Sequence, residues 1–137
     1  MLNFTIIPKW KDHEKDGEIF SLRMSSDASY IGSTLSNGLI NLRSATTGRL
    51  SYSLTHSPEG FPVFAIRFHP SIPRLFMSVS SDGSIKEWNN NNPQVTWSTP
   101  PNESNQLYAL EYDNNGTRFA TGGTDKTVRL YDTETKK

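Results

Sequence analysis

Residues 107–133 read LYALEYDNNGTRFATGGTDKTVRLYDT, and this stretch decides the fold. Three short runs in it alternate apolar and polar side chains, at 107–112, 119–124 and 128–131. The segments between them, 113–116 and 124–126, are rich in residues that favour tight turns. Short alternating runs separated by such turns are typical of antiparallel strands joined in hairpins. The stretch therefore predicts a unit of three antiparallel strands.

The same pattern recurs twice upstream. The middle copy has alternating runs at 63–69, 75–81, 84–89 and 94–99, and the first copy has them at 19–25, 30–36, 39–45 and 49–55. The turn residues Asn37, Asp82 and Asp125 occupy the same point of each copy, at successive spacings of 45 and 43 residues. The Asn37-Gly38 pair favours a type I′ hairpin. A period of about 40–45 residues with four strands per unit is that of β-propeller blades. The sequence predicts an all-β chain of about three four-stranded antiparallel blades.

From residue 18 onwards these copies resemble the repeats of the WD-repeat β-propeller family. Trp88-Asn89 and Tyr131-Asp132 stand where that family ends its third strand with a Trp-Asp pair, although Arg43-Ser44 stand there in the first copy. Asp82-Gly83 and Asp125-Lys126 occupy the family's tight turn between the second and third strands. The resemblance implies a partial WD-repeat β-propeller that acts as a non-enzymatic scaffold or adaptor for protein–protein interactions.

The length of 137 residues favours one domain, a single WD-repeat segment. We expect an N-terminal strand and connector at 1–17, blade one at 18–56, blade two at 62–100 and an incomplete blade three at 106–137. Alternation across residues 2–7 favours the N-terminal strand, and a frayed tail is the alternative. Too few residues follow the third strand of blade three to form a fourth. That blade therefore lacks its fourth strand unless the N-terminal strand or a partner supplies it.

Three blades are fewer than the four that a closed ring needs. An open arc would leave two sheet faces uncovered, and such apolar faces drive association. Either the chain is a fragment of a larger propeller assembly, or a partner completes it. A homodimer with three blades per copy would make a six-bladed ring.

The resemblance also implies a structural hydrogen-bond network in each blade. The family builds it from a Trp in the third strand, a Ser or Thr in the second, a turn Asp, and a His before the first strand. The matching residues are Trp88, Ser78 and Asp82 in blade two, Tyr131, Thr121 and Asp125 in blade three, and Ser33 and Asn37 in blade one. The expected His positions hold Lys15, Glu59 and Glu103. His56 lies three residues too early, and only a looser loop would let it serve.

A partner is expected at the rim of the central channel, where the family's first strands converge. Aligning the three first strands places aromatic residues in one position, Phe20, Phe64 and Tyr108, and charged residues in another, Arg23, Arg67 and Glu111. The arginines alternate with positions expected to be buried, such as Leu22 and Met24, so they should face the channel. Two guanidinium groups there would hold a carboxylate or phosphate bidentately. The alternatives are aromatic packing between blades, and arginines paired with Glu111 or solvent.

No catalytic, cofactor-binding or metal-binding residues are expected. The three histidines have no metal-ligand spacing, no Gly-x-Ser-x-Gly motif occurs, and the acidic pair Asp12 and Glu14 is expected on a solvated face. Gly122-Gly123 lies within a strand, where glycine permits close packing or a bulge. The alternative functions are a propeller-type hydrolase and a nucleic-acid-associated WD-repeat module. The formal charge of +0 argues against the second.

Three further features of the sequence indicate the cellular compartment. The chain has no cysteine, no apolar run near the length of a membrane span and no signal-peptide pattern at its start. These features predict an intracellular protein, cytoplasmic or nuclear, that does not span a membrane. The family resemblance implies that its partners are other proteins, and the neutral charge disfavours nucleic acid.

Overall fold

Three antiparallel sheets make up the computed structural model, which describes residues 5–15 and 17–137. Blade one contains β1 (Ile19–Met24), β2 (Tyr30–Leu35), β3 (Leu39–Ser44) and β4 (Leu50–Thr55). Blade two contains β5 (Val63–Phe68), β6 (Leu75–Ser80), β7 (Ile85–Asn89) and β8 (Gln94–Ser98). Blade three contains β9 (Leu107–Tyr112), β10 (Arg118–Gly123) and β11 (Val128–Asp132). The prediction of an all-β partial propeller is confirmed, and the described residues include no helix.

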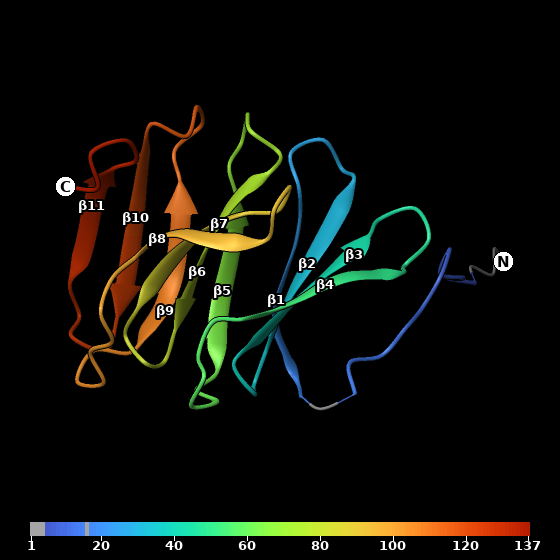
Figure 1. The fold of residues 1–137 in the computed structure, drawn as a ribbon, viewed down its shortest axis with the longest axis horizontal. Coiled ribbons are helices and arrows are strands. Elements are labelled where there is room, and N and C mark those ends of the chain that lie inside the picture. Colours follow the sequence, from blue (N-terminus) through green and yellow to red (C-terminus); the bar gives the residue numbers. More distant parts are fainter. Residues whose placement is uncertain (1–4, 16) are drawn as a thin grey trace, which may run out of the picture.

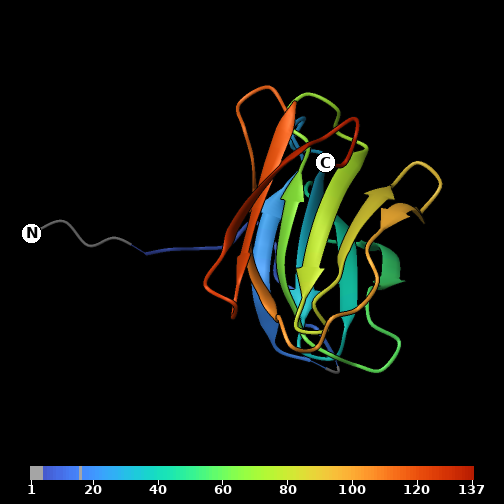
Figure 2. The same ribbon diagram turned by 90° about the vertical axis from the view of Figure 1, so that its left-hand side faces the viewer.

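The blades stand side by side in an arc that begins with blade one and ends with blade three (Figure 1). Within each blade the strands follow one another in chain order, each hydrogen-bonded to the next. The first strands β1, β5 and β9 are neighbours across the blade boundaries. Seen from the end of the arc, the sheets overlap as successive layers (Figure 2). Their faces therefore pack on each other while their first strands share one edge.

Two apolar cores hold the layers together. One lies between blades one and two, where Ile40 and Leu42 of β3 meet Ile66, Phe76 and Trp88 of blade two. Phe76 and Trp88 stack with centroids 6.0 Å apart and planes at 8°. The other core lies between blades two and three, and its buried members are Ala65, Met77, Val79, Ile85, Leu107, Leu110, Tyr112 and Phe119. Every buried cluster thus spans a blade boundary, so each sheet needs its neighbour.

The turn at Asn37-Gly38 differs from the expected type I′ hairpin, which needs positive φ at both central residues. Gly38 has φ of 91°, whereas Asn37 is not among the described residues with positive φ. The Gly38 amide donates to the Leu35 carbonyl at 3.4 Å, so the chain makes a tight turn before its left-handed residue. Gly83 and Lys126 take this position in blades two and three, with φ of 82° and 64°. Type I′ was therefore wrong, because a three-residue loop needs only one left-handed residue.

The N-terminal segment lies against blade one, at the opposite end of the arc from the incomplete blade three (Figure 1). Residues 2–4 of the strand expected at 2–7 lie outside the described residues, and residues 5–7 form no strand. Further along, the Trp10 indole donates to the Ala45 carbonyl at 2.9 Å. The described part of this segment therefore covers blade one and adds no strand to blade three.

Both ends of the arc expose apolar side chains. Leu22 and Met24 of β1 were expected to be buried but are each 53% exposed. Their counterparts in β5, Ile66 and Phe68, are buried because blade one covers them. At the other end of the arc, Val128 of β11 is 83% exposed. The difference follows from position, since no described blade packs on either terminal face.

A loop of blade three closes over His69, which follows β5 in blade two. Gly116 in this loop has φ of 75°, and a Cβ built on it would lie 2.2 Å from Nε2 of His69. The His69 ring is 6% exposed and meets the Tyr112 ring edge-on at a centroid distance of 5.2 Å. The ring therefore has little freedom to move aside.

We expect Gly116→Ala to lower the free energy of unfolding by about 3 kcal/mol, because left-handed strain and overpacking against His69 add together. Gly60→Ala is the matched control. Gly60 has φ of 84°, but its Cβ would meet only the Asn37 carbonyl oxygen, at 3.7 Å. This control should cost about 1 kcal/mol from strain alone. Urea unfolding of both variants measures the difference, and equal losses would show that the loop does not pack on His69 as described.

Candidate protein-interaction surface

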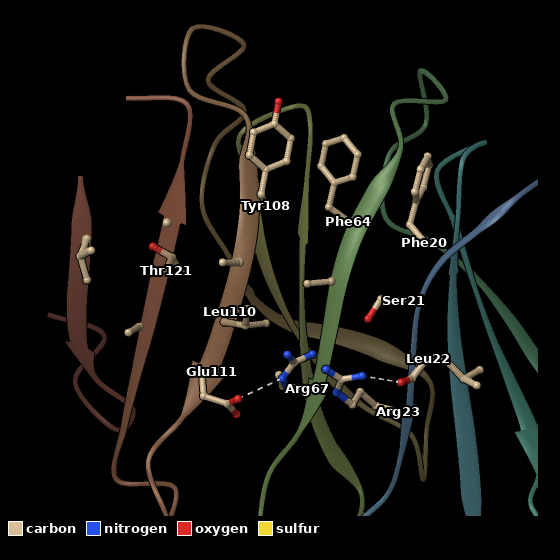
Figure 3. A pocket seen from close by; sticks show the side chains of 15 residues that line it. Phe20, Ser21, Leu22, Arg23, Phe64, Arg67, Tyr108, Leu110, Glu111 and Thr121 are labelled. Atoms are coloured by element: carbon tan, nitrogen blue, oxygen red, sulfur yellow. Dashed lines mark hydrogen bonds and ion pairs between the residues drawn. The ribbon is translucent and has the colours of Figure 1, made fainter. Parts of the chain in front are cut away.

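An open groove runs along the edge where the first strands of the three blades meet (Figure 3). Its volume is about 680 Å³, and β1, β5 and β9 supply most of its lining, with parts of β10 and β11. We call it the first-strand groove. It contains all six residues that the sequence placed at the channel rim.

Each first strand carries a β-bulge at its aromatic residue. Ile19 and Ser21 pair with the adjacent residues Leu35 and Thr34, so Phe20 is the extra residue. Phe64 has the same place between Val63 and Ala65, and Tyr108 lies opposite the register shift at Gly122 and Gly123. A bulge turns its extra side chain away from the regular alternation of the strand. In a regular strand, residues three positions apart point to opposite faces. The bulge therefore lets each aromatic side chain share the groove with the charged residue three positions later.

The aromatic residues form a continuous line, the aromatic row of Phe20, Phe64 and Tyr108. Ring centroids lie 5.3 Å apart between Phe20 and Phe64, and 4.8 Å apart between Phe64 and Tyr108. Phe20 is 46% exposed and Tyr108 is 48% exposed. The rings thus pack between blades, as the first alternative expected, while Phe20 and Tyr108 keep nearly half of their surface exposed.

Below them lies the charged row of Arg23, Arg67 and Glu111. Nε of Arg67 lies 3.4 Å from Oε2 of Glu111. Each arginine also donates through Nη1 to the carbonyl of its preceding residue, Leu22 or Ile66, at 2.8 Å. Within the described residues no carboxylate pairs with Arg23. The alternative that an arginine pairs with Glu111 therefore holds for Arg67 and not for Arg23.

The hydrogen-bond network of blade two centres on His56. Its Nδ1 lies 2.6 Å from Oγ of Ser78, and its Nε2 lies 2.8 Å from Oγ of Ser84. The Trp88 indole donates to the same Ser78 hydroxyl at 2.9 Å, and Ser84 donates to Asp82 at 2.6 Å. The structure thus joins Trp88, Ser78 and Asp82 through a histidine that the sequence spacing disfavoured. The loop before β5 is longer than the assumed spacing, and a search with variable loop length would have found His56.

The buried position of His56 changes its acidity. Burial lowers the pKa of His56 to about 4, against the attraction of the Asp82 carboxylate, whose Oδ1 is 3.9 Å from Nε2. The ring is therefore neutral at pH 7. A neutral imidazole has one donor and one acceptor nitrogen, which suits two hydroxyl partners.

Blade one replaces this network with an ion cluster. Glu14 of the connector accepts from Ser33 at 2.9 Å and from Arg43 Nε at 3.3 Å, and Asn41 also donates to it. Its side chain is 6% exposed, so the solvated face expected for Glu14 was wrong. Burial raises the pKa of the Glu14 carboxyl, but the bonds from Arg43, Asn41 and Ser33 outweigh it and the net pKa is lowered. Arg43 replaces the family's Trp, which explains why an acid takes the place of the histidine.

Blade three has a reduced version of the network. Thr121 is buried and Tyr131 stacks on Phe119 at 4.9 Å, but no hydrogen bond joins Tyr131 to Thr121 in the described part of the chain. Asp125 accepts from the Thr127 amide at 3.0 Å and pairs with Arg129 at 2.7 Å. In blade one the equivalent Asn37 accepts from the Leu39 amide at 3.2 Å. The turn residues thus stabilise their own turns in each blade.

The described residues, 5–15 and 17–137, contain no group of three or more His, Cys, Asp or Glu side chains arranged to hold a metal ion. His69 is buried at the turn after β5, where its Nδ1 accepts from the amides of Ser71 and Ile72 at 3.2 and 3.1 Å. No helix in this part of the chain has the length and apolar character of a membrane span.

Comparison with known families gives a match to the WD domain, G-beta repeat, over residues 48–89 and 93–132, which together are more than half of the chain. The chain belongs to the WD-repeat family. Each matched WD repeat begins near the last strand of one blade and ends with the third strand of the next. Sequence repeats and structural blades are therefore offset by one strand.

Among curated proteins, this WD-repeat chain is similar to the Polycomb group protein FIE2 of Zea mays, with 26% identity over 137 residues. The similarity covers 94% of this chain and 35% of FIE2. The chain therefore spans about a third of the length of this relative. Members of the family typically serve as protein-interaction scaffolds.

The network of blade two predicts a pH-dependent stability. Unfolded histidine binds its proton near pH 6.5, whereas folded His56 does so near pH 4. Between these values the unfolded chain binds more protons, so the free energy of unfolding falls as the pH is lowered from 6.5 to 4. His56 accounts for a loss of roughly 3 kcal/mol across this window.

We expect His56→Gln to destabilise the protein at pH 7 by about 2 kcal/mol, because two buried hydroxyls lose their shared partner. The variant should also show a shallower fall in stability between pH 6.5 and 4 than the unsubstituted chain. His13→Gln, at an exposed connector position, is the control and should change neither quantity. Chemical unfolding across this pH range measures both. An unchanged pH profile in His56→Gln would contradict the neutral, buried ring.

Proposed function

We propose that this WD-repeat chain is a non-enzymatic scaffold that binds an extended segment of a partner protein in the first-strand groove. The observation that carries the proposal is the convergence of three bulged first strands, each supplying one aromatic and one charged residue to the groove. Exposed aromatic rings supply contact area at low entropic cost, and charged side chains beside them fix orientation.

The chemistry of the groove supports binding rather than catalysis. Its hydroxyl groups, on Ser21, Tyr108 and Thr121, come from three separate strands. In the described part of the chain, none of them forms a hydrogen bond to a histidine or carboxylate side chain. The Tyr108 hydroxyl donates instead to the Gln106 side chain at 3.0 Å. A nucleophile needs a base within hydrogen-bond reach, and this groove pairs none.

The terminal faces of the arc support a second part of the proposal, that further blades complete the propeller. Leu130 of β11 is 59% exposed and Leu22 of β1 is 53% exposed, whereas their counterparts Leu42 of β3 and Ile66 of β5 are buried. The blades can come from a longer chain or from a second copy, which would make a homodimer of six blades. An intracellular setting, cytoplasmic or nuclear, belongs to the same proposal and rests on the sequence and on the Polycomb group relative.

A display library of random peptides tests the groove. We expect clones enriched on the unsubstituted chain to lose binding to Tyr108→Ala and to Arg67→Ala, which remove one residue of each row. Val95→Ala is the control, because Val95 is similarly exposed at 40% but lies on β8, away from the groove. Selection that enriches no clone, or clones that bind all three variants equally, would contradict the proposed docking site.

Light scattering tests the completion of the arc. The particle mass should rise with protein concentration, and Leu130→Lys should lower it toward that of one chain, because a charge on the terminal face opposes apolar packing. Glu59→Lys serves as a control, because Glu59 is exposed in the connector between blades one and two. A single-chain mass at every concentration of the unsubstituted protein would exclude self-association and leave a longer chain as the source of further blades.

A further inference from the structure

The charged row of the first-strand groove has an excess of positive charge. Arg23 and Arg67 carry two positive charges, whereas Glu111 is the acidic residue of the groove. Figure 3 shows both guanidinium groups directed into the same part of the groove, with Glu111 on the far side of Arg67. Neighbouring like charges repel each other, and an anion bound between them removes that cost. The groove therefore favours a negatively charged group at this point.

The arginines are held ready for such a group. The bonds to the Leu22 and Ile66 carbonyls orient both guanidinium groups at 2.8 Å. An arginine has five N–H donors in a planar fork that matches a carboxylate. Within the described residues, Arg23 uses one nitrogen, Nη1, as a hydrogen-bond donor. Arg67 uses two, Nη1 to the Ile66 carbonyl and Nε to Glu111. Both side chains therefore keep donors for a ligand, and in the described part of the chain only Arg67 has a carboxylate that would compete with it.

We infer that the groove selects partner segments with an aspartate or glutamate side chain, which binds between Arg23 and Arg67 while a nearby apolar side chain packs on the aromatic row. This inference rests on the proposed function. A carboxylate matches the net single positive charge of the charged row, whereas a phosphate carries about −1.5 to −2 at pH 7. A lysine side chain of the ligand would be attracted by the aromatic rings. The two arginines would repel it.

The spacing of the two rows sets the shape of the ligand. Phe64 and Arg67 are three residues apart on β5, which is about 10 Å along a strand. The acidic and apolar side chains of the ligand should be separated by a similar distance. A peptide that lies along the strands can contact both rows at once.

The test begins with a random peptide display library selected on the unsubstituted chain. Enriched peptides should contain an acidic residue near an apolar one, and Arg23→Gln should lose this preference. Arg49→Gln is the matched control, since Arg49 is exposed and lies outside the groove. Circular dichroism checks that each variant keeps its strands. Neutral or basic consensus peptides, or equal behaviour of the two variants, would overturn the inference.

A synthetic peptide from the most enriched clone gives the quantitative arm by fluorescence anisotropy. Replacing its acidic residue with glutamine, or Arg23 with glutamine, should each weaken binding roughly five- to tenfold, and both changes together should cost little more than one. Glu111→Gln should strengthen binding, because it removes a competing carboxylate. The inference would be overturned if the losses from the peptide change and from Arg23→Gln simply added together, or if Glu111→Gln bound the peptide more weakly. A phosphoserine peptide that binds more than tenfold tighter would also overturn it.

The outcomes separate the two proposals. Peptides that need Tyr108 but no acidic residue would contradict this inference and leave the docking groove in place. Selection that enriches no peptide would contradict both.

Discussion

The structure depends on the need of each sheet to cover its apolar face with the next sheet. Both buried clusters span a blade boundary, and neither is confined to one sheet. At the first boundary Phe76 and Trp88 are stacked beneath the side chains of blade one, while the Trp88 indole bonds to Ser78 and links the core to the polar network of His56. An isolated four-stranded sheet would have little core of its own, so the repeated blades stabilise one another as in other repeat proteins.

This packing also creates the groove. Because the blades lie face to face, their first strands meet along one edge, and equivalent residues of neighbouring strands line up as rows. The bulges at Phe20, Phe64 and Tyr108 then turn the aromatic side chains toward the same space as the charged row. Each bulge disturbs one position of the ladder but adds a ring to the surface. The proposed binding surface is therefore a property of the repeat rather than of any one blade.

Much of this fold was predictable from the sequence because turn residues recur at a blade's spacing. The alternation of β5 and the Asp82-Gly83 turn were sufficient to place the strands of blade two within about a residue of their observed ends. Contacts between segments far apart in the sequence were harder to predict. His56 reaches Ser78 through a loop whose length the expected spacing did not allow, and Glu14 pairs with Arg43 across 29 residues. Such contacts depend on the path of a loop, which local alternation does not encode.

The groove was predicted only in part for the same reason. Alignment of the first strands grouped six residues that line the groove, but it predicted neither the bulges nor the close packing of the aromatic row. The most direct test of the account is a measurement of nuclear Overhauser contacts between aromatic rings in solution. We expect contacts from Phe64 to both Phe20 and Tyr108, whose ring centroids lie 5.3 and 4.8 Å away. Absence of both contacts in the folded chain would show that the three first strands do not converge, and would contradict the account.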